Sequence, residues 1–488
     1  MDPTLRLKLS IMMFLQYAVW GSWAVSMGTY CGATLKFEGI QIGSIYSTTA
    51  IAAMISPLFM GILADRLFAT EKLIGTLHLI GGGLLLAAAT MKEFTPLYAV
   101  MVVYALCYMP TLALTNSISF ANITDPEKQF PGIRVWGTWG WIVAGWIVGF
   151  VLDAKTNVPL QLAGGLSLLL GFFSFFLPHT PPRGAATLST EPDSKGGQGI
   201  GQLLGDPSFL LFVIASFLIC IPLSLYYGFA NVFLTEIEAP YPTALQTIGQ
   251  MSEVGFMAAM PFFITRLGVK NMLAIGMLAW VARYVCFGTL SLPLVVVGLV
   301  LHGVCYDFFF VASQIYVDGR VTGSQRAAAQ SFIAFVTLGL GMFVGAYVGG
   351  YIVDKYPSPH QVATTVTDAS GKSETKSVVL PAWDPKGESG FAKDLGLKAT
   401  DTLSLSQLPE SITDGSTKLT GEELGKTLAT VDRNGDKAID RSEWVAARQH
   451  QWPMIWAIPA GMALVTCLIF YAGFRNPKVT TEPEPAVV

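Results

Sequence analysis

Long apolar segments, repeated along the whole 488-residue chain, most constrain how this sequence can fold. A membrane-spanning helix needs about 20 consecutive, mostly apolar residues. Charged residues make up only 13% of the chain, about half of their usual share in soluble proteins. The sequence therefore predicts an all-α membrane protein with twelve transmembrane helices. We expect them at 8–30, 41–63, 73–91, 96–120, 133–152, 159–177, 208–234, 246–264, 271–290, 293–317, 327–353 and 453–474.

A polar segment rich in Pro, Gly and Ser separates the sixth predicted helix from the seventh. Such a composition favours a flexible linker, and two six-helix halves joined by a linker are typical of secondary transporters, which bind solutes near the membrane midplane. We expect an N-terminal six-helix bundle at 1–177, a cytoplasmic linker at 178–207, a C-terminal six-helix bundle at 208–354 and 452–476, an extracytoplasmic insert at 355–451, and a cytoplasmic tail at 477–488.

The distribution of Lys and Arg predicts the orientation, because cytoplasmic loops carry an excess of these residues. If both termini are cytoplasmic, the short outer loops hold only Lys36, Lys92 and Lys155. The inner loops and tails then hold Arg6, Lys8, Arg66, Lys72, Lys128, Arg183, Lys195, Arg266, Lys270, Arg320, Arg326, Arg475 and Lys478. We therefore expect a multi-pass protein of the cell (inner) membrane with both termini in the cytoplasm, and we expect it to be a monomer.

Several functional classes find little support in the sequence. The net charge of -3 and the lack of a basic tract argue against nucleic-acid binding. No nucleophile–base motif is evident and no cysteines have metal-ligand spacing, so we expect neither an enzyme nor a required cofactor. A solute sensor that does not transport remains an alternative, although the short linker and tails carry no output domain.

Four charged residues lie within predicted membrane helices: Arg134, Glu253, Arg283 and Asp307. Intramembrane ionisable residues are costly and mark functional sites more often than not. Asp307 precedes three phenylalanines, and an apolar environment favours the neutral form of a carboxyl group. We therefore expect Asp307 to carry the coupled proton, with Glu253 as the alternative. Buried ion pairs that only fix helix register are the competing interpretation.

Polar and aromatic residues recur at helical spacing around these charges, where residues three or four apart share a face. The pattern predicts a cavity for a solute with a flat ring and a polar rim. A nucleoside fits this description, as does a sugar or other small polyol. The predicted substrate-binding residues are Arg134, Thr138, Trp141, Ser224, Tyr227, Gln250, Glu253, His302 and Tyr306.

Several stretches resemble the nucleoside:proton symporter family of the major facilitator superfamily. They include "LQYAVWGSW" (15–23), "YMPTLALTNSISF" (108–120), "FPGIRVWGTWG" (130–140), "IGQMSEVGF" (248–256) and "YDFF" (306–309). The resemblance implies nucleoside import by proton symport, with substrate residues carried over onto Arg134, Thr138, Gln250 and Glu253. Ser224, Tyr227 and His302 depart from the family pattern, which leaves nucleobase preference open.

The stretch "GILADR" at the end of the second predicted helix resembles the loop motif of the same superfamily. A small residue there lets helices approach closely, and the Asp65–Arg66 pair is expected to latch the two halves in one transport state. The equivalent loop of the second half, "ITRLGVKN", has no aspartate.

The insert contains the segment "DRNGDKAIDRSE", which matches the spacing of an EF-hand calcium loop. Lys437 occupies the position where that loop normally has glycine, which should weaken the site. We expect weak calcium binding in a small EF-hand-like module, and a decayed loop that keeps only the fold is the alternative. The predicted ligands are Asp432, Asn434, Asp436, Asp440 and Glu443.

Overall fold

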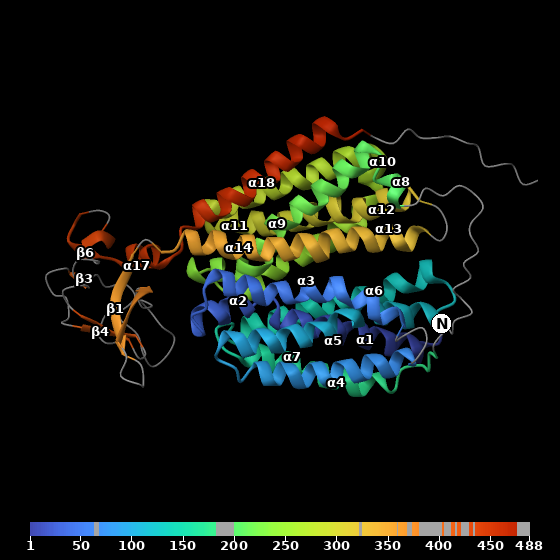
Figure 1. Ribbon diagram of the computed structural model, residues 1–488, viewed down its shortest axis with the longest axis horizontal. Coiled ribbons are helices and arrows are strands. Elements are labelled where there is room, and N and C mark those ends of the chain that lie inside the picture. Colours follow the sequence, from blue (N-terminus) through green and yellow to red (C-terminus); the bar gives the residue numbers. More distant parts are fainter. Residues whose placement is uncertain are drawn as a thin grey trace, which may run out of the picture.

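A bundle of long helices forms most of the molecule, and the insert projects from one end of it (Figure 1). We call this the insert end, and the opposite end, where the N-terminus lies, the linker end. The computed structural model describes residues 1–62, 68–181, 200–321, 325–358, 360–367, 373–379, 403–404, 411–414, 417–420, 429–432 and 435–475.

Two of the helices before residue 182 begin at strong start signals. Asp2 accepts hydrogen bonds from the backbone N–H groups of Thr4 and Leu5, and Asp125 accepts one from that of Lys128. A proline follows each of these two aspartates, as is common in the first helical turn. The long helices are α1 (Pro3–Trp23), α3 (Gly39–Ile62), α4 (Thr70–Ala88), α5 (Phe94–Ala121), α6 (Pro126–Trp146) and α7 (Val158–Ser174). Shorter elements are α2 (Met27–Thr29) and the π-helical η1 (Tyr30–Thr34) and η3 (Ile147–Val151).

The helices after residue 199 include two predicted spans that run on as one element. In α10 (Pro242–Gly288) the backbone breaks at Gly268, whose φ of 70° favours glycine, so the predicted helices at 246–264 and 271–290 lie on either side of a kink. The others are α8 (Ile200–Leu203), α9 (Pro207–Glu236), α11 (Leu292–Tyr306), α12 (Ala312–Asp318), α13 (Gln325–Ala334), α14 (Met342–Lys355) and α18 (Trp452–Gly473). Two π-helical segments, η5 (Asp307–Val311) and η6 (Phe335–Gly341), interrupt them.

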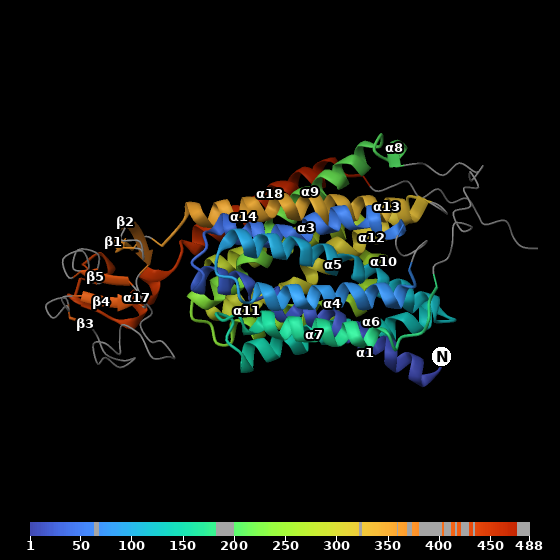
Figure 2. The same cartoon turned by 60° about the horizontal axis from the view of Figure 1, so that its bottom comes forward.

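The two sets of helices pack mainly within themselves and meet along a shared interface (Figures 1 and 2). In the first set α1 packs on α6 and α7, and in the second α10 packs on α11 and α18. The sets meet where α3 contacts α14, α2 contacts α9, and α6 contacts α10. The α3–α14 contact is very close, since a Cβ atom on Gly43 would lie 2.1 Å from the Ala346 carbonyl oxygen.

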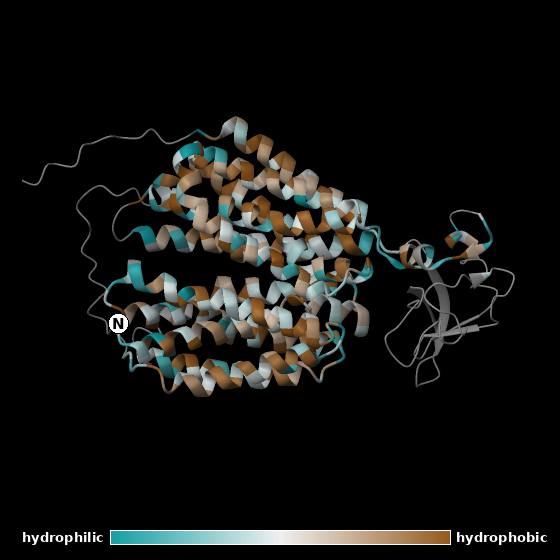
Figure 3. Cartoon of the chain, turned by 180° about the vertical axis from the view of Figure 1, so that it is seen from behind, coloured by the Kyte–Doolittle hydropathy of each residue, from teal (hydrophilic) through white to brown (hydrophobic). Residues whose placement is uncertain are grey.

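Hydropathy along the bundle suits a membrane. Hydrophobic residues cover the lengths of the helices and hydrophilic ones gather towards their ends (Figure 3). Within the described ranges, seven helices are long and apolar enough to cross a membrane. One of the remaining predicted spans, α7, falls short in length, because it has only 17 residues.

The insert contains strands, which the all-α prediction did not anticipate. In the described part of the insert they form three antiparallel pairs, and the second of these brings Leu403 opposite Ile439. The pairs are β1 (Gln361–Thr367) with β2 (Ser373–Val379), β3 (Leu403–Ser404) with β6 (Ala438–Ile439), and β4 (Ser411–Asp414) with β5 (Thr417–Thr420). Helix α17 (Arg441–Arg448) follows β6 and leads through His450 into α18.

Candidate functional site

Helix α6 contributes three of the predicted site residues from the first set of helices. Arg134, Thr138 and Trp141 are half-buried and lie one turn apart. The Arg134 guanidinium carbon lies 4.3 Å from the centre of the Tyr17 ring on α1, a cation–π contact. The Trp141 ring packs edge to face on Trp20, with 5.4 Å between their centres. This side of the site therefore presents a cation, a hydroxyl and an aromatic surface.

Helices α9, α10 and α11 contribute the opposite side. Oε2 of Glu253 lies 4.0 Å from Nε2 of His302; the Glu253 side chain is 22% exposed and that of His302 only 2%. The His302 ring centre is 5.8 Å from that of Tyr306 and 6.5 Å from that of Tyr227. Oε1 of Gln250 is buried without a hydrogen-bond partner among the described atoms. These side chains offer acceptors and aromatic faces around a solvent-accessible carboxylate.

Asp307 occupies an unusual position in the middle of its span. It starts the π-helical segment η5, and such interruptions of α-helices are frequent at functional sites. The residue is fully buried, and neither carboxylate oxygen has a hydrogen-bond partner among the described atoms. Of the three phenylalanines that follow it, Phe308 and Phe309 are buried and Phe310 is half-buried. A buried carboxyl group without a partner is costly when ionised, so this environment favours its protonated form.

Charges from both sets of helices converge near Glu253. The carboxylate lies within electrostatic range of Arg134 on α6 and of Asp307. Among the described side chains, Arg134 stacks on Tyr17 and makes no ion pair within 4 Å. The structure thus brings Arg134, Glu253 and Asp307 into one neighbourhood without direct Arg–carboxylate contact.

Two polar residues of α9 make hydrogen bonds to neighbouring helices. The Ser224 hydroxyl donates to the Met342 carbonyl oxygen on α14 at 3.1 Å. The Asn231 amide oxygen accepts from Thr29 at 2.6 Å, and its amide nitrogen donates to Thr243 at 3.0 Å. Asn231 therefore joins the two sets of helices near the insert end.

Arg283 lies next to the candidate site, because it contacts His302. In the sequence, the one sign of this was a charged residue inside a predicted membrane helix. Arg283 is fully buried, and its Nη1 lies 2.8 Å from Nδ1 of His302. By contrast, His78 on α4 is a buried core residue whose two ring nitrogens both have partners. Its ring nitrogens contact Ser167 Oγ at 3.0 Å and Gln16 Oε1 at 2.8 Å.

The predicted latch residues Asp65 and Arg66 lie outside the described residues. A different contact joins the two sets at the insert end, where the Asp354 carboxylate at the end of α14 accepts hydrogen bonds from the backbone N–H groups of Gly39 at 2.5 Å and Ile40 at 2.8 Å. These groups open α3, where the helix dipole favours an anion. Trp146 also donates to Thr247 across the interface at 3.1 Å.

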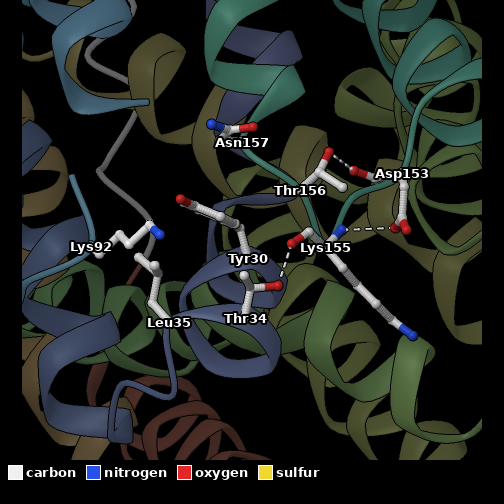
Figure 4. A pocket seen from close by; sticks show the side chains of 8 residues that line it. All are labelled: Tyr30, Thr34, Leu35, Lys92, Asp153, Lys155, Thr156 and Asn157. Carbon is white, nitrogen blue, oxygen red and sulfur yellow. Dashed lines mark hydrogen bonds between the residues drawn. The ribbon is translucent and has the colours of Figure 1, made fainter. Parts of the chain in front are cut away.

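A pocket of about 620 Å³ opens at the insert end of the first set of helices (Figure 4). The Thr34 hydroxyl donates to the Lys155 carbonyl oxygen there, and the Lys155 backbone N–H donates to Asp153 at 2.9 Å. The pocket is separate from the predicted substrate residues, because none of them lines it. Its lining is Tyr30, Thr34, Leu35, Lys92, Asp153, Lys155, Thr156 and Asn157.

The predicted calcium loop has part of the expected backbone geometry. Lys437 has a φ of 61°, the conformation that normally calls for glycine at this position. Asp432 accepts from the backbone N–H groups of Gly435 and Lys437, at 2.7 and 2.9 Å.

The other predicted calcium ligands make hydrogen bonds to nearby backbone N–H groups or lie outside the described residues. Asp440 and Glu443 form a reciprocal capping box at the start of α17, and Asp436 accepts from the backbone N–H of Ala438 at 2.7 Å. Asn434 is outside the described residues. In the part of the chain that the structure describes, no three His, Cys, Asp or Glu residues are grouped to hold a metal ion.

Comparison with known proteins identifies the family. A family model described as "Nucleoside H+ symporter" matches residues 3–368. YegT of Escherichia coli (strain K12) is 40% identical over 363 residues, which cover 71% of this chain and 84% of YegT. The xanthosine permease of the same organism is 34% identical over 372 residues, 72% of this chain and 89% of the permease.

Solved structures agree with this assignment. The crystal structure of a point mutant of the nucleoside transporter NupG superimposes with a TM-score of 0.72 at 26% identity, covering 96% of this chain and all of that one. The resemblance read from the sequence is thus confirmed. The chain belongs to the nucleoside–H+ symporter family of the major facilitator superfamily, and it is a membrane transporter that couples nucleoside import to protons.

Proposed function

We propose that nucleosides bind between α6 and the α9–α11 helices, with Glu253 at the centre of the site. The observation that carries this proposal is the position of Glu253, which remains 22% exposed while it faces His302 and lies within electrostatic range of Arg134. A carboxylate there accepts hydrogen bonds from sugar hydroxyls, and Gln250 one turn away supplies a free amide oxygen.

Aromatic residues on both sides would hold the base. Trp141 approaches from α6, and Tyr306 and Tyr227 from α11 and α9, so that a flat ring can stack between them. Thr138 and Arg134 contribute polar contacts at the rim. Ser224 retains a role only if its hydroxyl exchanges the Met342 carbonyl for the substrate.

Proton coupling is assigned to Asp307, with Glu253 as the group through which substrate occupancy acts on it. The two carboxyl groups lie within electrostatic range, so ionising both at once is unfavourable. Asp307 would bind a proton from the outside, cross with the substrate, and release the proton inside. Arg134 would compensate whichever carboxylate is ionised as the helices rearrange.

For the membrane arrangement, we propose twelve spans in two six-helix halves, 1–177 and 208–354 with 452–476, with both termini cytoplasmic in the inner membrane. The kinked α10 counts as two spans, and the helices before residue 182 and after residue 199 pack chiefly within their own sets. The insert end would then face outward, and the Asp354–Gly39 contact would close that side. We further propose that the transporter works as a monomer, with Asp65 and Arg66 acting as a latch on the inner side.

For the insert, we propose weak calcium binding by Asp432, Asn434, Asp436, Asp440 and Glu443. Two features support it: the left-handed backbone at Lys437 and the pairing of Ile439 with Leu403, which steadies the loop. Ligation requires Asp440 and Glu443 to leave their capping box. Extracellular modules of this kind bind calcium at about 10⁻⁴ to 10⁻³ M, so titration of the full chain with millimolar calcium tests the proposal.

Uptake into proteoliposomes tests the function. Vesicles with an imposed inward proton gradient should accumulate labelled uridine, adenosine or xanthosine, and a protonophore should abolish the accumulation. Competition by a panel of unlabelled nucleosides and sugars measures selectivity, and we expect nucleosides to compete and sugars to fail. Competition by sugars alone would favour the polyol alternative, and binding without uptake would favour a sensor.

A further inference from the structure

Arg283 is a buried cation that the proposed substrate and proton sites do not use. Its side chain is fully buried in α10, with the guanidinium carbon 3.6 Å from the centre of the Tyr226 ring. Nε and Nη2 have no hydrogen-bond partner among the described atoms, whereas Nη1 lies 2.8 Å from Nδ1 of His302. Arg283 also interacts with the Cys305 side chain. Burying a guanidinium costs several kcal/mol of desolvation, so the short contact with His302 directs attention to that ring.

The chemistry of this contact determines where the His302 proton lies. A guanidinium has only donors, so Nδ1 of His302 must act as the acceptor and carry no proton. In a neutral imidazole the proton then resides on Nε2, and Nε2 is the atom that faces Oε2 of Glu253 at 4.0 Å. A doubly protonated ring would place an N–H against the guanidinium at 2.8 Å, which the geometry does not accommodate.

From this we infer that Arg283 is a positioning residue: it holds His302 as the neutral Nε2–H tautomer and so keeps a hydrogen-bond donor directed at Glu253. This inference rests on the proposed role of Glu253 in substrate binding. The carboxylate then faces a fixed dipole on the α11 side in place of a second cation, and it stays available to sugar hydroxyls. A different tautomer would turn a lone pair towards Glu253 and repel it.

The surroundings of His302 are consistent with this assignment. Tyr226 and Tyr227 on α9 approach the imidazole with ring centres at 5.7 and 6.5 Å, and Tyr306 does so on α11 itself. The charged groups that face the ring come from α10. They are Arg283 at Nδ1 and Glu253 at Nε2. Arg283 therefore supplies the contact that selects the tautomer, and the tyrosines enclose the ring.

Solid-state NMR of the full chain in lipid, labelled with ¹⁵N-histidine, tests the inference without altering Arg283. The chain has five histidines, and the His302→Gln variant assigns the signals of the ring in question. We expect an unprotonated Nδ1 and a protonated Nε2 on His302 between about pH 5 and 8, the range in which an unperturbed histidine titrates. A proton on Nδ1, or a doubly protonated ring at the lower pH, would overturn the inference.

Kinetic variants provide an independent test. A lysine at position 283 can donate but not accept, so Arg283→Lys should keep the KM for nucleoside within about three-fold of the wild type. Arg283→Gln supplies an amide that serves either tautomer, and it should raise KM by roughly ten-fold, the scale of one hydrogen bond to a charged group, while Vmax changes less.

The glutamine variant should also show a new ionisation in the pH profile of uptake, because its His302 is free to protonate. Equal KM values for the lysine and glutamine variants, with an unchanged pH profile, would contradict the inference. If the wild-type protein fails to transport nucleosides at all, the proposed function fails, whereas the NMR result still decides the tautomer.

Discussion

Nε2 of His302 on α11 lies 4.0 Å from Oε2 of Glu253 on α10, so an imidazole and a carboxylate from neighbouring helices face each other inside the bundle. The carboxylate is partly exposed and the imidazole is buried. A solute that binds beside Glu253 would therefore meet a hydrogen-bond acceptor that also faces the His302 ring. We therefore propose Glu253 as the residue where substrate binding and proton transfer meet.

Replacing Glu253 with glutamine should weaken nucleoside binding. The amide keeps the shape but loses the charge, and a hydrogen bond to a charged group contributes about 1.5–3 kcal/mol, or roughly ten- to 150-fold in affinity. We expect a rise of that order in KM for uptake into proteoliposomes. Glu93→Gln, which alters an exposed carboxylate at the start of α5, is the matched control and should leave KM unchanged. Unchanged affinity in Glu253→Gln would remove this residue from the substrate site.

Asp307→Asn should separate transport from its driving force. The asparagine cannot bind and release a proton, so accumulation driven by a pH gradient should be lost while exchange of labelled for unlabelled nucleoside continues. Asp318→Asn is the control, because that carboxylate lies at the end of α12 and is 47% exposed. Full gradient-driven accumulation by Asp307→Asn would shift the coupling role to Glu253.

The Asp354 contact should hold the insert end closed. Asp354→Asn weakens the hydrogen bonds to the first N–H groups of α3 and removes the charge that suits the helix dipole. A cysteine at Thr247, which is 3% exposed and bonded to Trp146, reports opening in a background where the six native cysteines are replaced. Labelling by a membrane-impermeant maleimide should increase several-fold.

Glu38→Gln is the control for the Asp354 experiment, since it alters an exposed carboxylate beside the same helix start. Its labelling rate should equal that of the parent. If Asp354→Asn also labels at the parent rate, this contact does not govern closure of the insert end.

The connection between the insert and the bundle should depend on pH. His450 contacts Glu236 at 2.8 Å, and Trp452 donates to the same carboxylate at 2.7 Å. Burial lowers the pKa of His450, but the Glu236 carboxylate opposes this effect and the net pKa is raised above 6.5. A raised pKa in the folded state stabilises the structure below about pH 6.5, and that contribution is lost as the pH rises through the folded value.

Hydrogen exchange in α17 and the start of α18 measures this effect. Protection in the wild type should decrease as the pH is raised above about 6.5, after correction for the intrinsic exchange rate. His450→Gln retains a hydrogen bond without a titrating group and should show a flat corrected profile. A flat profile in the wild type would contradict this prediction.

Lys437→Gly should strengthen calcium binding by the insert. The backbone at this position has a φ of 61°, which glycine adopts at lower cost than lysine, and the substitution also removes a positive charge from the loop. Calorimetry on the full chain should show tighter binding than in the wild type. Asp432→Asn is the comparison variant and should reduce it. Absence of a calcium heat in both Lys437→Gly and the wild type would leave the loop as a structural element only.

Much of the architecture could be predicted because a membrane imposes strong constraints on sequence. Apolar length places α9, and the span formed by α11, η5 and α12, with few errors, since every backbone polar group in lipid must be satisfied within a helix. Charges inside the spans marked Glu253 and Asp307 for the same reason. The strands β1 and β2 were missed because a soluble insert has no such constraint and their Thr- and Ser-rich sequences resemble loops.

Contacts between distant segments could not be predicted from spacing. The pairing of Arg283 with His302 joins residues 19 apart on different helices, and Asp354 reaches Gly39 across 315 residues. Neither has a local periodic signal. Ser224 fits the helical stripe of the predicted site, yet its hydroxyl bonds to α14, because spacing defines a face and not what packs against it.

Direct measurement of proton movement tests the central claim, which is that nucleoside and proton cross together. Proteoliposomes that contain the wild-type protein and a luminal pH indicator, with no initial pH gradient, should acidify inside when a nucleoside is added outside. Asp307→Asn vesicles should show no such change. Nucleoside entry into wild-type vesicles without luminal acidification would contradict the account.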